Sequence, residues 1–383
     1  MSDRLEEVPR AGRLACFCPP GLAPDEECDL APSGLAPAAL GAVMAGFALS
    51  VLAQTLAIGV LPIAGMLLAP SPAWSTAPYA ALLLGAAVAT FPASFLEGAF
   101  GRRAAFALGA SHGVAGGLVM AWAVSNAHFV ALCLGAFWLG VAQGFSLFYR
   151  HLVGLDARAG ANRAMAAVFA AGAFAGLVGP ALATFAAELA PQRLYAGAAL
   201  AAALAQVGVM ALAWAAPTGA AVATERALRA ERPVTWTALA APTGLGALAW
   251  FAMTAIMIGA PSAMMGCGVS AAAATGAVAW HVVAMYAPAI LVPWLAGLVG
   301  APAMAAAGLA LMALAKWLTG GADSYLPFVA ALILVAVGWA WTTAAATQWL
   351  HQSGRPSRAQ LALHDAALFA AAILGAFAGA PRP

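Results

Sequence analysis

The chain has 383 residues, of which 64% are hydrophobic and 8% are charged, and its net charge at pH 7 is +2. Soluble domains carry about 25% charged residues, so this composition excludes a water-soluble fold, whose surface would be one continuous apolar patch. No dense basic cluster indicates nucleic-acid binding. The partner that the composition does predict is the lipid bilayer.

The N-terminal residues differ from the rest of the chain. Residues 1–37 are polar, acidic and rich in proline, and they lack the apolar core of a signal peptide. We therefore expect no cleaved leader and predict a disordered cytoplasmic tail over residues 1–38. Three cysteines in this tail, Cys16, Cys18 and Cys28, would be free thiols in the reducing cytoplasm.

The remaining sequence is organised in hydrophobic stretches of about 20 residues, the length that a helix needs to cross ~30 Å of hydrocarbon. The stretches do not alternate apolar and polar residues as the strands of a transmembrane β-barrel do. They are rich in alanine and glycine, which allow membrane helices to pack closely. We predict eleven helical spans, at residues 39–67, 75–96, 104–124, 127–149, 164–187, 194–215, 236–260, 272–296, 302–319, 325–349 and 361–379.

A charged connection divides the spans into two groups. We predict a six-helix bundle over 39–216, a cytoplasmic linker over 217–234, and a C-terminal bundle of five spans over 235–383. Two helical bundles joined by a cytoplasmic loop are typical of alternating-access carriers, which bind their substrate near the membrane midplane. The predicted fold is therefore an all-α polytopic membrane protein, its second bundle one span short of its first.

The distribution of Lys and Arg predicts the orientation. With the N-terminus in the cytoplasm, thirteen of these residues fall on the cytoplasmic side and three on the other side. This asymmetry agrees with the positive-inside rule. An odd number of spans then puts the C-terminus outside.

Two short motifs resemble those of the major facilitator superfamily. The loop after the second span reads EGAFGRR over residues 97–103, and the fifth span contains GLVGP over residues 176–180. The first is similar to the superfamily's signature between spans two and three, although its acid precedes the first glycine here. The resemblance implies a transporter with two helical half-bundles, and it implies no catalytic activity and no bound cofactor.

Sulfur and imidazole groups are the unusual side chains within the spans. Met253 and Met257 in the seventh span, and His281 and Met285 in the eighth, are each spaced i, i+4 and share a helix face. Because the two helices are consecutive and antiparallel, their side chains could converge. Thioethers select Cu(I), and imidazole suits copper in either oxidation state. No Asp or Glu is expected near a span centre, so proton coupling through a buried carboxylate has no candidate.

The same residues resemble those of CcoA-type copper importers, a branch of the major facilitator superfamily. The likeness is most specific over residues 250–290, which include APSAMMGCG at 260–268. It implies import of copper through the bacterial inner membrane for assembly of cbb3-type cytochrome oxidase. Under this resemblance the metal ligands are Met253, Met257, His281 and Met285, with Cys267 as an accessory thiol. The tail cysteines could then receive Cu(I), and a cytoplasmic copper chaperone becomes a candidate partner.

Two alternatives remain open from the sequence. A carrier for a neutral or aromatic organic solute, such as a flavin, would suit the twelve tryptophans and the scarcity of charged residues in the spans. A membrane enzyme or metal-sensing scaffold is the third interpretation. No HExxH motif and no Ser-His-Asp arrangement support it, so the sequence favours a transporter of copper or of a small organic molecule.

Overall fold

The computed structural model describes residues 37–149, 161–189, 195–215, 234–354 and 356–379. All of these belong to one compact unit, Gly34–Pro383. The predicted tail lies almost wholly outside the described residues, as do its three cysteines and nearly all of the predicted linker.

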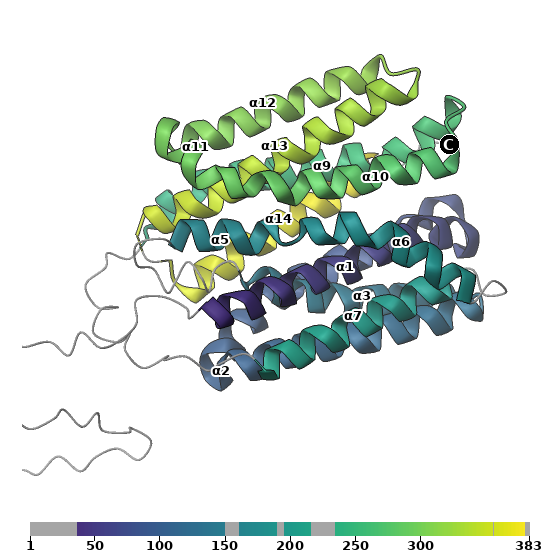
Figure 1. The fold of residues 1–383 in the computed structure, drawn as a ribbon, viewed down its shortest axis with the longest axis horizontal. Helices are drawn as coiled ribbons and strands as arrows, with labels where there is room; N and C mark the ends of the chain where they lie inside the picture. The colour runs from purple at the N-terminus through teal and green to yellow at the C-terminus, as the bar shows by residue number, and fades with distance from the viewer. Residues whose placement is uncertain (1–36, 150–160, 190–194, 216–233, 355, 380–383) are drawn as a thin grey trace, which may run out of the picture. The chain divides into compact units, whose positions relative to one another are not determined.

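The described residues of the first half of the chain form helices (Figure 1). We call these helices the N-terminal half: α1 (Pro37–Leu68), α2 (Ala77–Ser125), α3 (Phe129–Leu147), α5 (Ala161–Ala170), α6 (Ala173–Leu189) and α7 (Ala196–Ala215), with a short 3-10 helix, η1, at Pro72–Trp74.

The second half forms the C-terminal half. It comprises α9 (Trp236–Gly266), α10 (Ala271–Tyr286), the 3-10 helix η2 (Ala287–Leu291), α11 (Val292–Val299), α12 (Ala301–Gly320), α13 (Tyr325–Gln352) and α14 (Arg358–Gly379). Polar residues fix where its first two helices begin, because a side-chain oxygen accepts a bond from a free backbone N–H. Thr235 accepts from the N–H of Ala238 at 3.2 Å, and Ser270 accepts from that of Ala273 at 3.2 Å.

Within the described residues, eleven segments are long and apolar enough to cross a membrane, which confirms the predicted number of spans. The second and third spans, Pro72–Leu96 and Arg103–Ser125, meet at Gly101 within α2. Gly101 has φ +80° and ψ +166°, a backbone conformation essentially open to glycine alone. The EGAFGRR motif therefore lies at a sharp bend in the backbone.

Two predicted spans are broken near their middle. The fifth span is divided at Ala171–Gly172 into α5 and α6, and the eighth is divided by η2 into α10 and α11. Each still forms one membrane-crossing segment, Asn162–Glu188 and Ala273–Val299, as predicted. Proline explains the second break, since Pro288 lies within η2 and has no backbone N–H to donate. The first break does not fall at the predicted Gly-Pro motif, because Pro180 lies inside α6.

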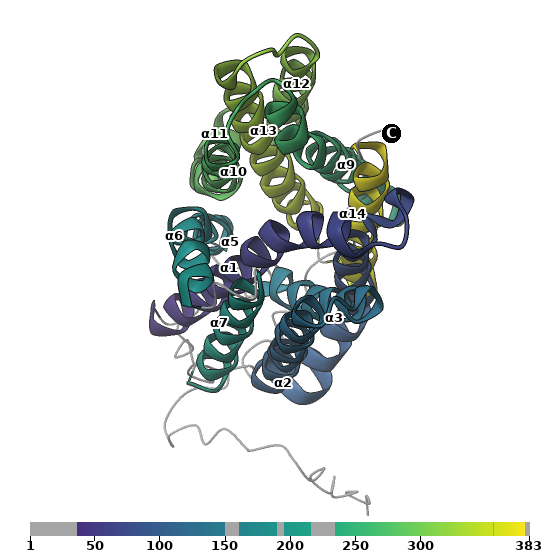
Figure 2. The ribbon, with the colours of Figure 1, turned by 90° about the vertical axis from the view of Figure 1, so that its right-hand side faces the viewer.

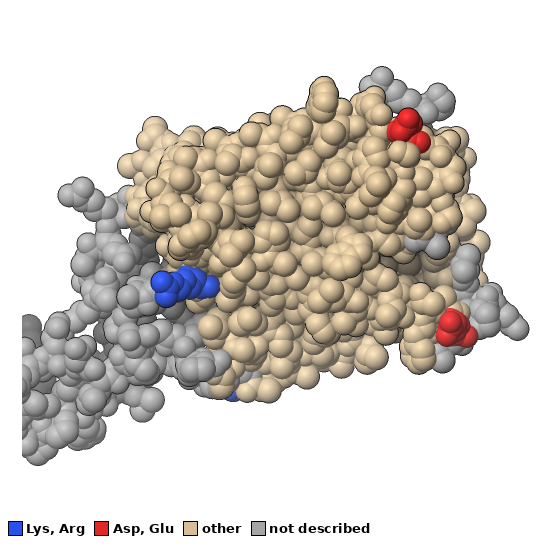
Figure 3. Space-filling model, turned by 45° about the horizontal axis from the view of Figure 1, so that its top comes forward, with Lys and Arg blue, Asp and Glu red and all other residues tan. Residues whose placement is uncertain are grey.

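Among the described residues at the surface, charged side chains lie toward the ends of the bundle. We call the inner end the one at which α1, α5, α9 and α14 begin. Arg103, Arg163 and Arg358 lie toward this end, whereas Glu188 and Asp323 lie toward the outer end, with Lys316. Figure 3 shows an uncharged band between the coloured side chains. Large apolar side chains such as Leu204 and Trp214 are exposed on the bundle, as lipid contact requires.

The two halves contact each other through pairs of helices. In the N-terminal half α2 packs on α3 and α7, and in the C-terminal half α13 packs on α9, α10 and α12. Between the halves, α14 packs on α2, α10 packs on α6, and α5 packs on η2. Figure 2 shows α13 between α10 and α9, which are consecutive in the sequence. The broken helices of the two halves therefore lie together.

Candidate functional site

Aromatic side chains from both halves meet where the broken helices lie together. The rings of Phe169 and Tyr286 are 5.2 Å apart, and those of Phe169 and Trp339 are 5.5 Å apart. Trp250 extends the group, 5.1 Å from Trp339 and 5.0 Å from Phe369. We call six residues the aromatic cluster: Phe47, Phe169, Trp250, Tyr286, Trp339 and Phe369.

The aromatic cluster is buried at about the middle of the bundle. Each of its side chains is at most 5% exposed. Trp339 lies 14 residues from the start of α13, and Trp250 lies 14 residues from the start of α9 at the opposite end, so both are ~21 Å along their helices. This is the depth at which carriers with two half-bundles bind their substrates.

Several polar atoms near the aromatic cluster are buried without a hydrogen-bond partner among the described residues. They include the indole N–H groups of Trp250 and Trp339 and the hydroxyl groups of Thr254 and Thr343. Leaving a buried donor unpaired costs about 1–3 kcal/mol. These groups can therefore bind the polar atoms of a solute that enters between the halves.

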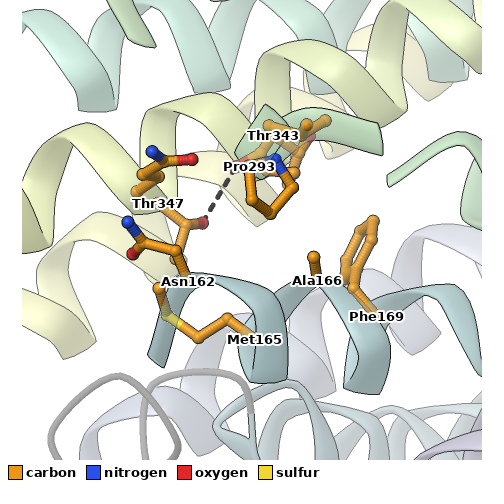
Figure 4. A pocket seen from close by; sticks show the side chains of 10 residues that line it. Asn162, Met165, Ala166, Phe169, Pro293, Thr343 and Thr347 are labelled. Carbon is orange, nitrogen blue, oxygen red and sulfur yellow. Dashed lines mark hydrogen bonds between the residues drawn. The ribbon is translucent and has the colours of Figure 1, made fainter. Parts of the chain in front are cut away.

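A cavity opens beside Phe169 toward the inner end. Figure 4 shows Asn162, Met165 and Phe169 of α5 on one wall and Thr343 and Thr347 of α13 on the other. The hydroxyl group of Thr347 donates to the backbone carbonyl of Thr343 at 2.9 Å. The cavity volume is about 20 Å³, which is enough for about one water molecule. A larger solute therefore requires the halves to separate.

The predicted metal ligands are all buried. His281 is 0% exposed, Met253 is 4% exposed, and Met257 and Met285 are each 8% exposed. The Nδ1 atom of His281 lies 2.7 Å from the backbone carbonyl of Leu332, which makes Nδ1 the protonated nitrogen. Its Nε2 then carries a lone pair and has no hydrogen-bond partner in the described structure. A carbonyl that fixes the tautomer in this way is common behind metal-binding histidines.

The packing brings Met257 and His281 toward one region, although α13 separates much of α9 from α10. At the outer end, one apolar cluster contains residues of all three helices: Ala260, Met264, Ala274, Ala277, Phe328 and Leu332. Met257 is one turn inward from Ala260, and His281 is one turn inward from Ala277. By the rise of the helix, each lies ~14–15 Å from the outer end of its helix. The ligand assignment itself stays a prediction.

Cys267 lies apart from those four residues. It is the exposed C-cap of α9, ~15 Å closer to the outer end than His281 by the rise of α10. Within the described ranges, no three His, Cys, Asp or Glu side chains are grouped so that they could hold a metal ion. A copper site here would depend on thioether donors.

One expectation about charge was wrong. Asp365, on α14, is 1% exposed, so the spans do contain a buried carboxylate. The predicted span 361–379 places Asp365 close to the start of the helix, whereas α14 begins at Arg358 and carries Asp365 deeper. Its neighbour His364 is 0% exposed and lies 2.9 Å from the hydroxyl of Thr243 through Nδ1. A titratable pair is therefore buried against α9.

Comparison with known proteins provides the family. No family model matches the chain. The riboflavin transporter RfnT of Brucella anthropi is 31% identical over 288 residues, which cover 72% of this chain and 71% of that protein. It is a riboflavin transporter and not a copper importer, so the CcoA branch stays a prediction.

Solved transporters have the same fold. The human organic anion transporter MFSD10 is 17% identical with a TM-score of 0.58, covering 89% of this chain and 91% of its own. The major facilitator superfamily proton:xylose symporter XylE is 13% identical with a TM-score of 0.59, covering 88% of this chain and 86% of its own. With the relationship to RfnT, these similarities show that the chain belongs to the major facilitator superfamily and is a membrane transporter.

Proposed function

We propose that this transporter carries a neutral aromatic solute of the flavin type. The aromatic cluster is the observation that supports this most directly. Three of its ring contacts join the two halves: Phe47 with Tyr286 at 6.0 Å, and Phe169 with both Tyr286 and Trp339. When a planar aromatic solute enters between the halves, its ring can replace these contacts by stacking on the same side chains. Each such ring contact is worth about 0.5–1.5 kcal/mol.

The polar groups of the aromatic cluster fit the same kind of solute. The indole N–H groups of Trp250 and Trp339 are donors without a partner in the described structure, and a flavin ring presents carbonyl and ring-nitrogen acceptors at its edge. The relationship to RfnT, a riboflavin transporter by name, also supports this proposal.

Transport of riboflavin into liposomes that contain the purified protein tests the proposal, because exchange of labelled for unlabelled riboflavin does not depend on transport direction. We expect the Trp339→Leu variant to raise KM roughly 3- to 10-fold, the effect of about 0.5–1.5 kcal/mol, and Trp339→Phe to retain most activity. The matched control is Trp317→Leu, since Trp317 is 74% exposed on α12. Absence of riboflavin exchange by folded wild-type protein would refute the proposal.

Copper import is the second candidate function, and the buried Nε2 of His281 favours it. This nitrogen carries a lone pair, and the carbonyl of Leu332 fixes its tautomer. The thioether of Met257, on α9, lies at a similar depth in the bundle. Neutral thioether and imidazole ligands bind Cu(I) without being deprotonated, and they cost less to bury than carboxylates do.

Copper accumulation by cells tests this second candidate. The Met257→Leu variant keeps the apolar volume and removes the sulfur, so it should abolish accumulation if Met257 is a ligand. The Met312→Leu variant is the control, because Met312 is also buried but lies on α12. Equal copper accumulation by both variants would exclude a role for Met257.

A further inference from the structure

The cavity at the inner side of Phe169 has a chemistry different from that of the aromatic cluster. The wall formed by the C-terminal half carries the hydroxyl groups of Thr343 and Thr347 and the amide of Gln348. The wall formed by the N-terminal half carries the amide of Asn162. Among the described residues, none of those that line the cavity is Asp, Glu, Lys or Arg. Its polarity therefore comes from uncharged groups.

Thr343 connects the cavity with the aromatic cluster. It is 1% exposed, and its hydroxyl group has no hydrogen-bond partner among the described residues. Thr343 also lies one helical turn from Trp339 on α13, on the same side of the helix. A solute whose ring contacts Trp339 would therefore bring its nearest substituent to the hydroxyl of Thr343.

We infer that this cavity is a subsite for an uncharged, hydroxyl-bearing arm attached to the aromatic ring of the solute, with Thr343 as its principal hydrogen-bonding residue. The inference rests on the proposed function and adds to it a second chemical requirement. Because one wall belongs to α5 and the other to α11 and α13, separation of the two halves widens the cavity. A negatively charged arm is disfavoured, since none of the lining residues that the structure describes supplies a cation to offset its desolvation.

Three probes with the same ring system test the inference in liposomes: riboflavin, with its ribityl arm; lumiflavin, in which a methyl group replaces the arm; and flavin mononucleotide, whose arm ends in phosphate. We expect wild-type protein to prefer riboflavin to both others. The Thr343→Val variant, which loses one hydroxyl and changes little in shape, should raise the KM for riboflavin roughly 3- to 10-fold. Its KM for lumiflavin should not change.

Thr342→Val is the matched control. Thr342 is a buried neighbour on the same helix, but its hydroxyl donates to the carbonyl of Ala305 on α12 at 3.1 Å. This variant should affect riboflavin and lumiflavin alike, if it affects either. An equal shift for both probes in Thr343→Val, or none, would overturn the subsite while leaving flavin transport intact. If flavin mononucleotide is transported as well as riboflavin, the inferred requirement for an uncharged arm is overturned. Transport of none of the three would overturn the proposed function and this inference together.

Discussion

The ring of Tyr286 on α10 lies so close to Gly172 that a Cβ atom at Gly172 would come within 2.6 Å of the ring atom Cδ1. One turn along, a Cβ at Gly176 would come within 2.7 Å of Val283. These two glycines come from the N-terminal half and their partners from the C-terminal half. The absence of side chains at both positions therefore lets the two halves close beside the aromatic cluster.

The Gly172→Ala substitution should disfavour this closed arrangement, because overpacking a tight contact costs about 1–3 kcal/mol. We expect the rate of transport to fall about tenfold or more while the protein still reaches the membrane. Initial rates of exchange in liposomes, normalised to the amount of protein, measure the effect. Gly276→Ala is the control on α10, since nothing lies within 4 Å of its added Cβ. Wild-type rates in both variants would show that this close contact is not needed for transport.

The Gly101→Ala substitution should destabilise the protein, since the backbone of Gly101 has φ +80° and ψ +166°. A residue with a Cβ atom pays about 1–3 kcal/mol to adopt such a conformation. We expect a lower Tm in detergent and less protein in the membrane. Gly59→Ala, within α1, should leave the Tm unchanged or raise it, because its Cβ meets no other atom within 4 Å and alanine favours helix. Equal Tm values for the two variants would argue against the bend.

Reporter fusions test the predicted orientation. A fusion at the C-terminus should be periplasmic, and one beside Arg229 should be cytoplasmic. The described arginines agree, since Arg103, Arg163 and Arg358 lie toward the inner end of the bundle. A cytoplasmic C-terminus would contradict either the number of spans or the positive-inside assignment.

Local properties of the sequence were sufficient to predict the spans and to predict that His281 and Met285 share a helix face. Hydrophobic length and helical periodicity depend only on neighbours in the sequence, and both survive in the structure. The break at Gly172 could not be predicted, because alanine and glycine fill every span and nothing local distinguishes this glycine. Its role depends on Tyr286, which is 114 positions away in the numbering of the chain.

The aromatic cluster could not be predicted from the sequence for a related reason. Its six side chains come from six helices, and no spacing in the sequence connects them. The abundance of tryptophan was a weak signal, since Trp250 and Trp339 belong to the cluster whereas Trp317 is exposed. Distinguishing these roles requires knowing which faces α9 and α13 turn toward the other half.

Opposite effects of two substitutions should separate the aromatic and copper proposals. In the His281→Gln variant the side-chain amide can still donate to the carbonyl of Leu332, but it lacks the imidazole lone pair of Nε2. If copper is the substrate, this variant should lose copper accumulation, whereas Trp339→Leu should retain it. If a flavin is the substrate, the His281→Gln variant should transport riboflavin nearly as well as wild type. The Trp339→Leu variant should then transport riboflavin less well than wild type. Both substrates are measured in the same cells, with the amount of membrane protein determined for each variant. Loss of both activities in both variants would mean that Trp339 and His281 maintain the fold, and it would remove both residues from the substrate site.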